Sequence, residues 1–313
     1  MAAGHDDGGV NAVRSKDPQS SAVPVPLVER LRGHVEALDR VRHPITAPDG
    51  LDAARSYLGE TLDRLGFRVD LQLVTDQPVN QYNVIARAPG DISPLALVLE
   101  AHYDTVPDSR GADDNASGVA GMLEIARLIG PQAGLAFASF CLEEDRLQGA
   151  AAFVDSLGWR ERPACIDLEM IGYTRPEPLG QRLPIRMAGR RWELPLPYTG
   201  QAIAIASNWR SRRLAKALAS ACAHEGQLAI PLALPGLEWA MPDIRRSDHA
   251  FFWRRDLEAV MVTDTANFRN PHYHRPTDIP ETLDFPFMSR VVRGTARYLC
   301  RQLRDNRSGR SAA

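Results

Sequence analysis

The spacing of apolar residues divides the chain into alternating helices and strands. Residues 26–41 and 49–65 carry apolar side chains three or four positions apart, as on one face of a helix. Shorter apolar runs predict strands over residues 68–74, 82–86, 95–101, 135–142, 165–171, 202–206, 228–232 and 259–263. Between and after them, helical spacing predicts helices over residues 116–129, 149–156, 211–224 and 287–302.

Strands that alternate with helices favour the α/β class. We expect a single three-layer domain, with a central, mostly parallel mixed sheet flanked by helices. Residues 1–24 are rich in Gly, Ser, Asp and Ala and lack periodicity, which predicts a disordered tail before a domain over residues 25–313. Residues 174–200 also lack clear periodicity, and their length indicates a functional loop or lid.

Composition narrows the possible partners and the compartment. A net charge of -2 argues against nucleic acid or an acidic membrane surface as the main partner. No basic stretch leads into an apolar one at the N-terminus, and no apolar run could cross a bilayer. A reducing, cytoplasmic location is favoured because the cysteines are few, widely spaced and form no CxxC pair: Cys141, Cys165, Cys222 and Cys300. The oligomeric state stays open.

Acidic residues and histidines gather where apolar runs give way to polar ones. The segments are His102-Tyr103-Asp104, Asp113-Asp114-Asn115, Glu143-Glu144, Glu169-Met170 and His272-Tyr273-His274. Functional groups in open α/β sheets cluster beyond the carboxyl ends of the strands. Buried carboxylates are costly unless a cation or hydrogen bonds compensate them, so this pattern indicates bound metal.

Each segment also has a structural interpretation when it is taken alone. Asp and Asn are favoured N-caps, so Asp113 and Asp114 could simply start a helix, although one of them could instead bridge two cations. Neighbours that leave a strand point in different directions, so one of Glu143 and Glu144 can bind metal while the other handles protons. Asp104 could accept the second imidazole N–H of His102.

The last histidine segment leaves the choice of ligand open, since either His272 or His274 could bind metal. Asp167 is interpreted as a structural acid and His249 as a hydrogen-bonding residue at the edge of the core. Arg245 and Arg246 could recognise a substrate carboxylate, although solvated arginines are commoner.

Together the segments resemble the zinc aminopeptidases of metallopeptidase family M28, which are co-catalytic two-zinc exopeptidases and their relatives. The resemblance covers residues 95–285, with six motifs in family order. They are His102-Tyr103-Asp104-Thr105-Val106-Pro107, Gly111-Ala112-Asp113-Asp114-Asn115-Ala116-Ser117-Gly118, Glu143-Glu144, Glu169-Met170-Ile171-Gly172, Ser247-Asp248-His249-Ala250 and Asn270-Pro271-His272-Tyr273-His274.

The resemblance implies two zinc ions per chain and a ligand set for each. The ligands would be His102, Asp114 and Glu169 for one ion, and Asp114, Glu144 and His274 for the other. Glu143 would be the general base toward a metal-activated water, and Asp104 would orient His102. The Asp114–Asn115 peptide would be cis. The implied reaction is hydrolysis of an amide bond in a peptide or small amide substrate.

Two departures from the family pattern leave alternatives open. Many of these aminopeptidases carry aspartate at the position of Glu169, and glutamate there often accompanies carboxypeptidase or amidohydrolase action. Arg146 follows the glutamate pair where relatives commonly have a small residue, so the nearby rim differs. A one-zinc acyltransferase similar to glutaminyl cyclase is a further alternative, but the retention of His102 and Glu169 argues against it. A non-catalytic binding relative would have lost ligands, and none is obviously lost here.

Overall fold

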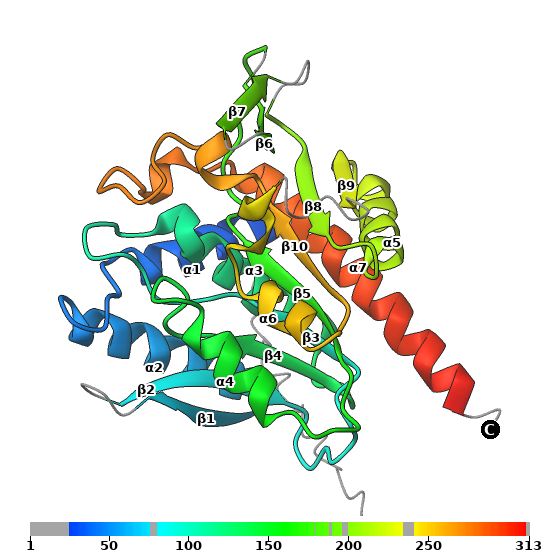
Figure 1. Cartoon of the computed structure of the whole chain (residues 1–313). Helices are drawn as coiled ribbons and strands as arrows, with labels where there is room; N and C mark the ends of the chain where they lie inside the picture. The colour runs from blue at the N-terminus through cyan, green and yellow to red at the C-terminus, as the bar shows by residue number, and fades with distance from the viewer. Residues whose placement is uncertain are drawn as a thin grey trace, which may run out of the picture.

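A mixed sheet of eight strands forms the centre of the fold (Figure 1). The computed structural model describes residues 25–75, 80–178, 180–187, 190–195, 200–233 and 241–310. The strand order is β1–β2–β4–β3–β5–β10–β8–β9. The strands are β1 (Arg68–Thr75), β2 (Gln81–Arg87), β3 (Leu97–Glu100), β4 (Leu135–Ser139), β5 (Ala164–Glu169), β8 (Ile203–Ser207), β9 (Ala229–Ala233) and β10 (Ala259–Thr263).

The four central strands β4, β3, β5 and β10 run parallel, and β9 is parallel to β8. The pairs β1–β2, β2–β4 and β10–β8 are antiparallel. Because the central strands share one direction, their carboxyl ends meet at one edge of the sheet, where an α/β fold places its functional groups.

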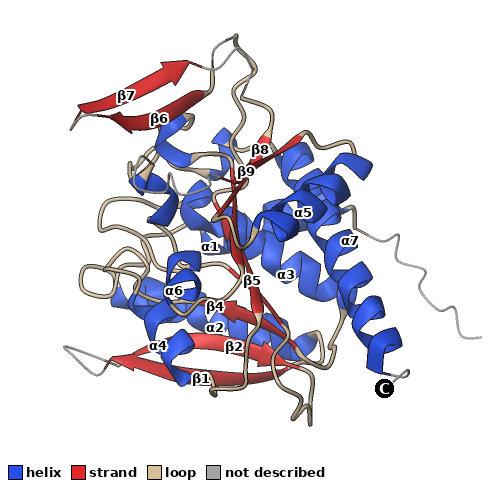
Figure 2. Cartoon of the chain, turned by 45° about the vertical axis from the view of Figure 1, so that its right-hand side comes forward, coloured by secondary structure: helices blue, strands red, loops and turns tan. Residues whose placement is uncertain are grey.

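Helices cover both faces of the sheet and complete the three layers (Figure 2). One face packs against α1 (Leu27–Leu38), α2 (Pro48–Arg64), α3 (Gly118–Ile129), α5 (Arg212–His224) and α7 (Phe285–Arg310). The other packs against α4 (Gln148–Ser156) and α6 (His249–Arg254). Alternation along β3 explains the two cores: Leu97 and Leu99 join the first, and Val98 between them joins the second.

Short turns of helix connect these layers. They are η1 (Ala112–Ser117), η2 (Pro242–Arg245), η3 (Ala266–Phe268) and η4 (Pro280–Thr282). A separate antiparallel hairpin of β6 (Arg182–Met187) and β7 (Arg190–Pro195) lies away from the main sheet (Figure 2). The sequence analysis missed this hairpin within residues 174–200, because the paired backbone of a hairpin needs no alternation of apolar side chains. The interpretation of the segment as a functional loop or lid stays a prediction.

Several predicted boundaries shift in the structure. The apolar run predicted as a strand to residue 142 leaves the sheet at Ser139, and Cys141 N donates to the Asn83 side chain at 3.0 Å. Phe140, Cys141 and Leu142 are nevertheless buried. The apolar run over these residues therefore indicated burial and not membership of the strand. The short helix α6 was missed, and α7 extends beyond residue 302. The tail predicted for residues 1–24 lies outside the described residues. In the described part of the chain, no helix is long and apolar enough to cross a membrane.

Candidate metal centre

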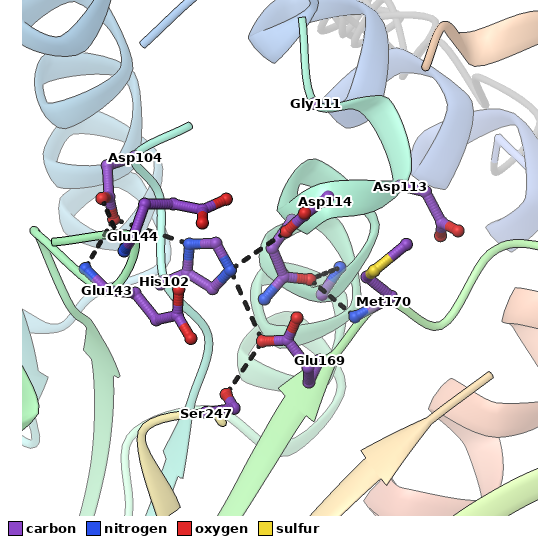
Figure 3. A network of polar contacts seen from close by, with 12 residues as sticks. His102, Asp104, Gly111, Asp113, Asp114, Glu143, Glu144, Glu169, Met170 and Ser247 are labelled. Carbon is purple, nitrogen blue, oxygen red and sulfur yellow. Dashed lines mark hydrogen bonds and ion pairs between the residues drawn. The ribbon is translucent and has the colours of Figure 1, made fainter. Parts of the chain in front are cut away.

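The loops that follow β3 and β5 bring one histidine and two carboxylates together (Figure 3). His102 comes two residues after β3, Glu169 is the last residue of β5, and Asp114 lies within η1. His102 Nε2 is 3.3 Å from Asp114 Oδ1 and 3.4 Å from Glu169 Oε2. All three side chains are buried, and together they form a candidate metal site.

A second triad uses the other oxygen of the same aspartate. His274 Nε2 is 3.1 Å from Asp114 Oδ2 and 3.2 Å from Glu144 Oε1. These two triads are the metal-ligand groups found among the described residues, and Asp114 belongs to both. A carboxylate that offers one oxygen to each triad has the arrangement of a bridging ligand.

Unpartnered polar atoms indicate that these residues fit a metal ion. His102 Nε2, His274 Nε2 and Asp114 Oδ2 are buried and have no hydrogen-bond partner in the structure. Buried polar atoms are nearly always satisfied, and one ion in each triad would satisfy these three. Imidazole nitrogens and carboxylate oxygens together are a donor set that zinc takes in proteins.

The backbone around Asp114 is held in place by hydrogen bonds from distant parts of the chain. Asp278 accepts the N–H groups of Asp113 at 2.8 Å and Asp114 at 3.1 Å. Asn115 Oδ1 accepts the N–H of Gly118 at 3.1 Å, as a helix cap does. The capping interpretation therefore applies to Asn115, whereas the Asp114 carboxylate faces the two histidines. The Asp114–Asn115 peptide is cis, as the family resemblance implied.

Asp104 connects His102 to the two glutamates. Its Oδ1 lies 3.5 Å from His102 Nδ1, and its two oxygens accept the N–H groups of Glu143 and Glu144, each at 3.2 Å. Of the two glutamates, Glu144 joins a metal triad and Glu143 does not. Burial raises the pKa of Glu143 well above its ordinary value. A carboxyl group that is buried beside the ligands and is not one of them can take up and release protons.

Other predicted candidates take structural positions. His272 Nδ1 lies 2.9 Å from Thr277 Oγ1, outside both triads, so the structure places His274 and not His272 beside Asp114. Asp113 accepts N–H groups from Gly172 and Asn270. His249 and Asp167 pair with each other in the protein interior. His249 Nδ1 lies 2.8 Å from Asp167 Oδ2, and His249 Nε2 lies 2.7 Å from the Ile244 carbonyl.

Three residues to which the sequence analysis assigned no role support the site. Ser247 Oγ donates to Glu169 Oε2 at 2.9 Å, Asp278 accepts the backbone N–H groups of Asp113 and Asp114, and Arg42 donates to the carbonyl groups of Tyr103 and Gly111. The Ser247 motif was visible in the sequence, without an assigned role. Arg42 gave no sequence signal, because a charged residue is normally read as exposed, and Asp278 had no assigned role.

A cavity of about 520 Å³ opens beside both triads. Asp114, Glu143, Glu144, Glu169 and His274 line its reactive wall. Its floor is one face of β8, β9 and β10, where side chains at alternate positions are small or apolar: Ala204, Ala206, Ile230, Leu232 and Met261. The cavity therefore has a polar wall that contains the candidate metal ligands and an apolar floor, as in many small-molecule and peptide sites.

Comparison with known proteins agrees with this geometry. The profile of peptidase family M28 matches residues 83–299. The protein named Uncharacterized protein YfbL from Escherichia coli (strain K12) is 33% identical over 293 residues, which are 87% of this chain and 87% of that protein. Aminopeptidase YwaD of Bacillus subtilis (strain 168) is 38% identical over 85 residues, 25% of this chain and 19% of that enzyme.

Solved structures show the same fold. A leucine aminopeptidase precursor from Bacteroides thetaiotaomicron has a TM-score of 0.64 at 18% identity, covering 86% of this chain and 95% of that chain. Glutaminyl cyclase from Porphyromonas gingivalis has a TM-score of 0.66 at 20% identity, covering 88% and 98%. The fold is thus common to hydrolases and to a cyclase, and the site residues have to discriminate between them.

Proposed function

The chain belongs to peptidase family M28 and is a metallopeptidase, and we propose that it is an aminopeptidase that works with two zinc ions. The observation that carries the two-zinc proposal is the Asp114 carboxylate, whose two oxygens face two separate histidines. One ion would be held by His102, Asp114 and Glu169, and the other by Asp114, Glu144 and His274.

The protein groups have separate tasks in the proposed hydrolysis. Zinc at these ligands would supply Lewis acidity, which polarises the substrate carbonyl and lowers the pKa of the attacking water. Glu143 accepts the proton of that water and delivers it to the departing amine, as general base and then general acid. Asp104 holds the His102 ring and the backbone of Glu143 in register, which keeps the proton acceptor beside the reacting carbonyl.

The lining of the cavity supports action at the N-terminus of a peptide. Glu169 lines the cavity, and because Ser247 and His102 both lie beside its Oε2, its Oε1 can accept a charge-assisted hydrogen bond from a protonated amino group. The apolar floor suits the side chain of the first residue. The printed name of the Bacillus subtilis relative, an aminopeptidase, also supports this direction.

A one-zinc cyclase is the second candidate, because a glutaminyl cyclase shares the fold. Its single site would correspond to Asp114, Glu144 and His274, and would leave His102 and Glu169 without a task. Here both are buried and their side chains lie within 3.4 Å of each other, with Ser247 donating to Glu169. This complete first triad favours the hydrolase.

The experiment compares one leucyl peptide with a free and with an acetylated N-terminus, using protein purified without chelator and dialysed against zinc. Cleavage of the free peptide alone supports an aminopeptidase. Cleavage of both, or of a residue at the C-terminus, would instead support the carboxypeptidase or amidohydrolase alternative. Elemental analysis in parallel should find about two zinc ions per chain, and about one after His102→Ala.

A further inference from the structure

Four arginines line the cavity, and they differ in whether protein groups already pair with their guanidinium groups. Arg269 donates to Gln181 and to the Ala202 carbonyl, and Arg246 donates to Asn267 and to the Tyr273 hydroxyl. Arg182 also has an interaction partner. Arg146 is exposed, and it makes no hydrogen bond or ion pair to the part of the chain that the structure describes. Its charge is therefore available to a ligand.

The backbone at Arg146 is unfavourable for arginine. Its φ of 66° lies in the left-handed region, which glycine adopts without cost and other residues adopt at about 1–2 kcal/mol. The turn is closed by hydrogen bonds from Leu147 N to Glu143 O at 2.9 Å and from Gln148 N to Leu142 O at 3.0 Å. Leu142 and Leu147 also have positive φ, so the whole turn that carries Arg146 to the rim of the cavity is strained, and strained turns cluster at functional sites.

Arg146 lies on the side of the cavity where the leaving residue of the substrate is expected. Glu143, three residues earlier on the same turn, has to reach the amine that departs. The leaving residue therefore lies beside this turn, whereas the apolar floor formed by β8, β9 and β10 receives the first residue. A guanidinium next to a leaving amino acid pairs with a carboxylate, which it can bind through two parallel N–H groups.

We propose that Arg146 binds a carboxylate on the leaving side of the scissile bond, so that the preferred substrates are dipeptides whose free α-carboxylate pairs with it. This substrate class rests on the proposed aminopeptidase function. The ligand that Arg146 would recognise is a carboxylate on the residue directly after the scissile bond. A second possible source is therefore an acidic side chain on the leaving residue of a longer peptide.

The test is a binding measurement that needs no turnover. Calorimetry on zinc-loaded Glu143→Gln protein gives Kd for leucyl-alanine, for leucyl-alaninamide and for leucyl-glutamic acid α-amide. We expect leucyl-alanine to bind about tenfold more tightly than its amide, as an ion pair at a partly open site would give. In E143Q/R146Q and in E143Q/R146G the two Kd values should become equal. E143Q/R301Q, which changes an exposed arginine on α7, should keep the tenfold ratio.

Three results would overturn the proposal: a Kd ratio near one in the E143Q protein, a ratio that survives both Arg146 substitutions, or tighter binding of the side-chain carboxylate than of the dipeptide. The aminopeptidase proposal fails separately, if the unmodified protein hydrolyses no free peptide. An Arg146-dependent Kd ratio in that case would still establish the carboxylate site.

Discussion

Arg42→Met should lower the free energy of unfolding by at least about 3 kcal/mol, although Arg42 touches no metal ligand side chain. The residue is fully buried, and its guanidinium donates to carbonyl groups on both sides of the site. The distances are 2.8 Å from Nε to Tyr103 O, 2.5 Å, 3.1 Å and 2.7 Å from Nη1 to Leu38 O, Arg40 O and Arg110 O, and 3.0 Å from Nη2 to Gly111 O.

The size of this loss in the free energy of unfolding follows from the hydrogen bonds to backbone carbonyl groups that methionine cannot make. Tyr103 O would lose its donor in a fully buried hydrogen bond, and a buried group left unsatisfied costs about 1–3 kcal/mol. Leu38 O and Gly111 O keep the N–H groups of Arg40 and Ala116, but each loses a buried hydrogen bond from the charged guanidinium, worth about 1.5–3 kcal/mol. Burial lowers the pKa of Arg42 to about 10, so the group remains charged at neutral pH and its charge is also lost. The total is a large part of the roughly 5–15 kcal/mol by which domains are stable.

Urea denaturation of the zinc-loaded protein measures this loss. Arg40→Met is the matched control, because Arg40 is exposed and its side chain bonds only to Ala37 O among the described residues, so its effect should stay within about 0.5 kcal/mol. Arg42→Lys keeps the charge with one nitrogen in place of three and should fall between the two. A loss below about 1 kcal/mol for Arg42→Met would refute the assignment of these hydrogen bonds.

Three further outcomes test the site and the fold. Glu143→Gln should reduce kcat/KM by about 10²–10⁴-fold without changing the zinc content, and a variant that lost zinc as well would contradict the separation of base and ligands. Dialysis against a chelator should lower Tm, and added zinc should restore it, because only the folded state assembles both triads; a Tm indifferent to zinc would count against them. Burial would raise the pKa of Glu124, but hydrogen bonds from His34, Arg30 and Arg127 bring it to about 2, below the ordinary 4.5. The carboxylate therefore stabilises the fold above about pH 4.5, and urea titrations should show the deficit of Glu124→Gln shrinking as the pH falls from about 5 to about 2.

Most of the secondary structure could be predicted because periodicity reflects burial. The apolar runs located all eight strands of the main sheet, and the helical spacing located α1 to α5 and α7. The same reasoning placed the end of β4 too late, since Phe140 and Cys141 are buried without belonging to the strand. It missed the β6–β7 hairpin, which is a separate pair outside the main sheet.

The sequence by itself determined which side chains stand at the carboxyl ends of the strands, and the family motifs they form. Only the tertiary structure decided how they combine. That Asp114 faces both His102 and His274 depends on a loop 160 residues further along the chain. The support from Arg42 and Ser247, and the place of Arg146 in the lining of the cavity, likewise became visible only in three dimensions. The physical reason is range: periodicity reports the local surroundings of a residue, whereas hydrogen bonds and ligand sets form between segments that the strand order brings together.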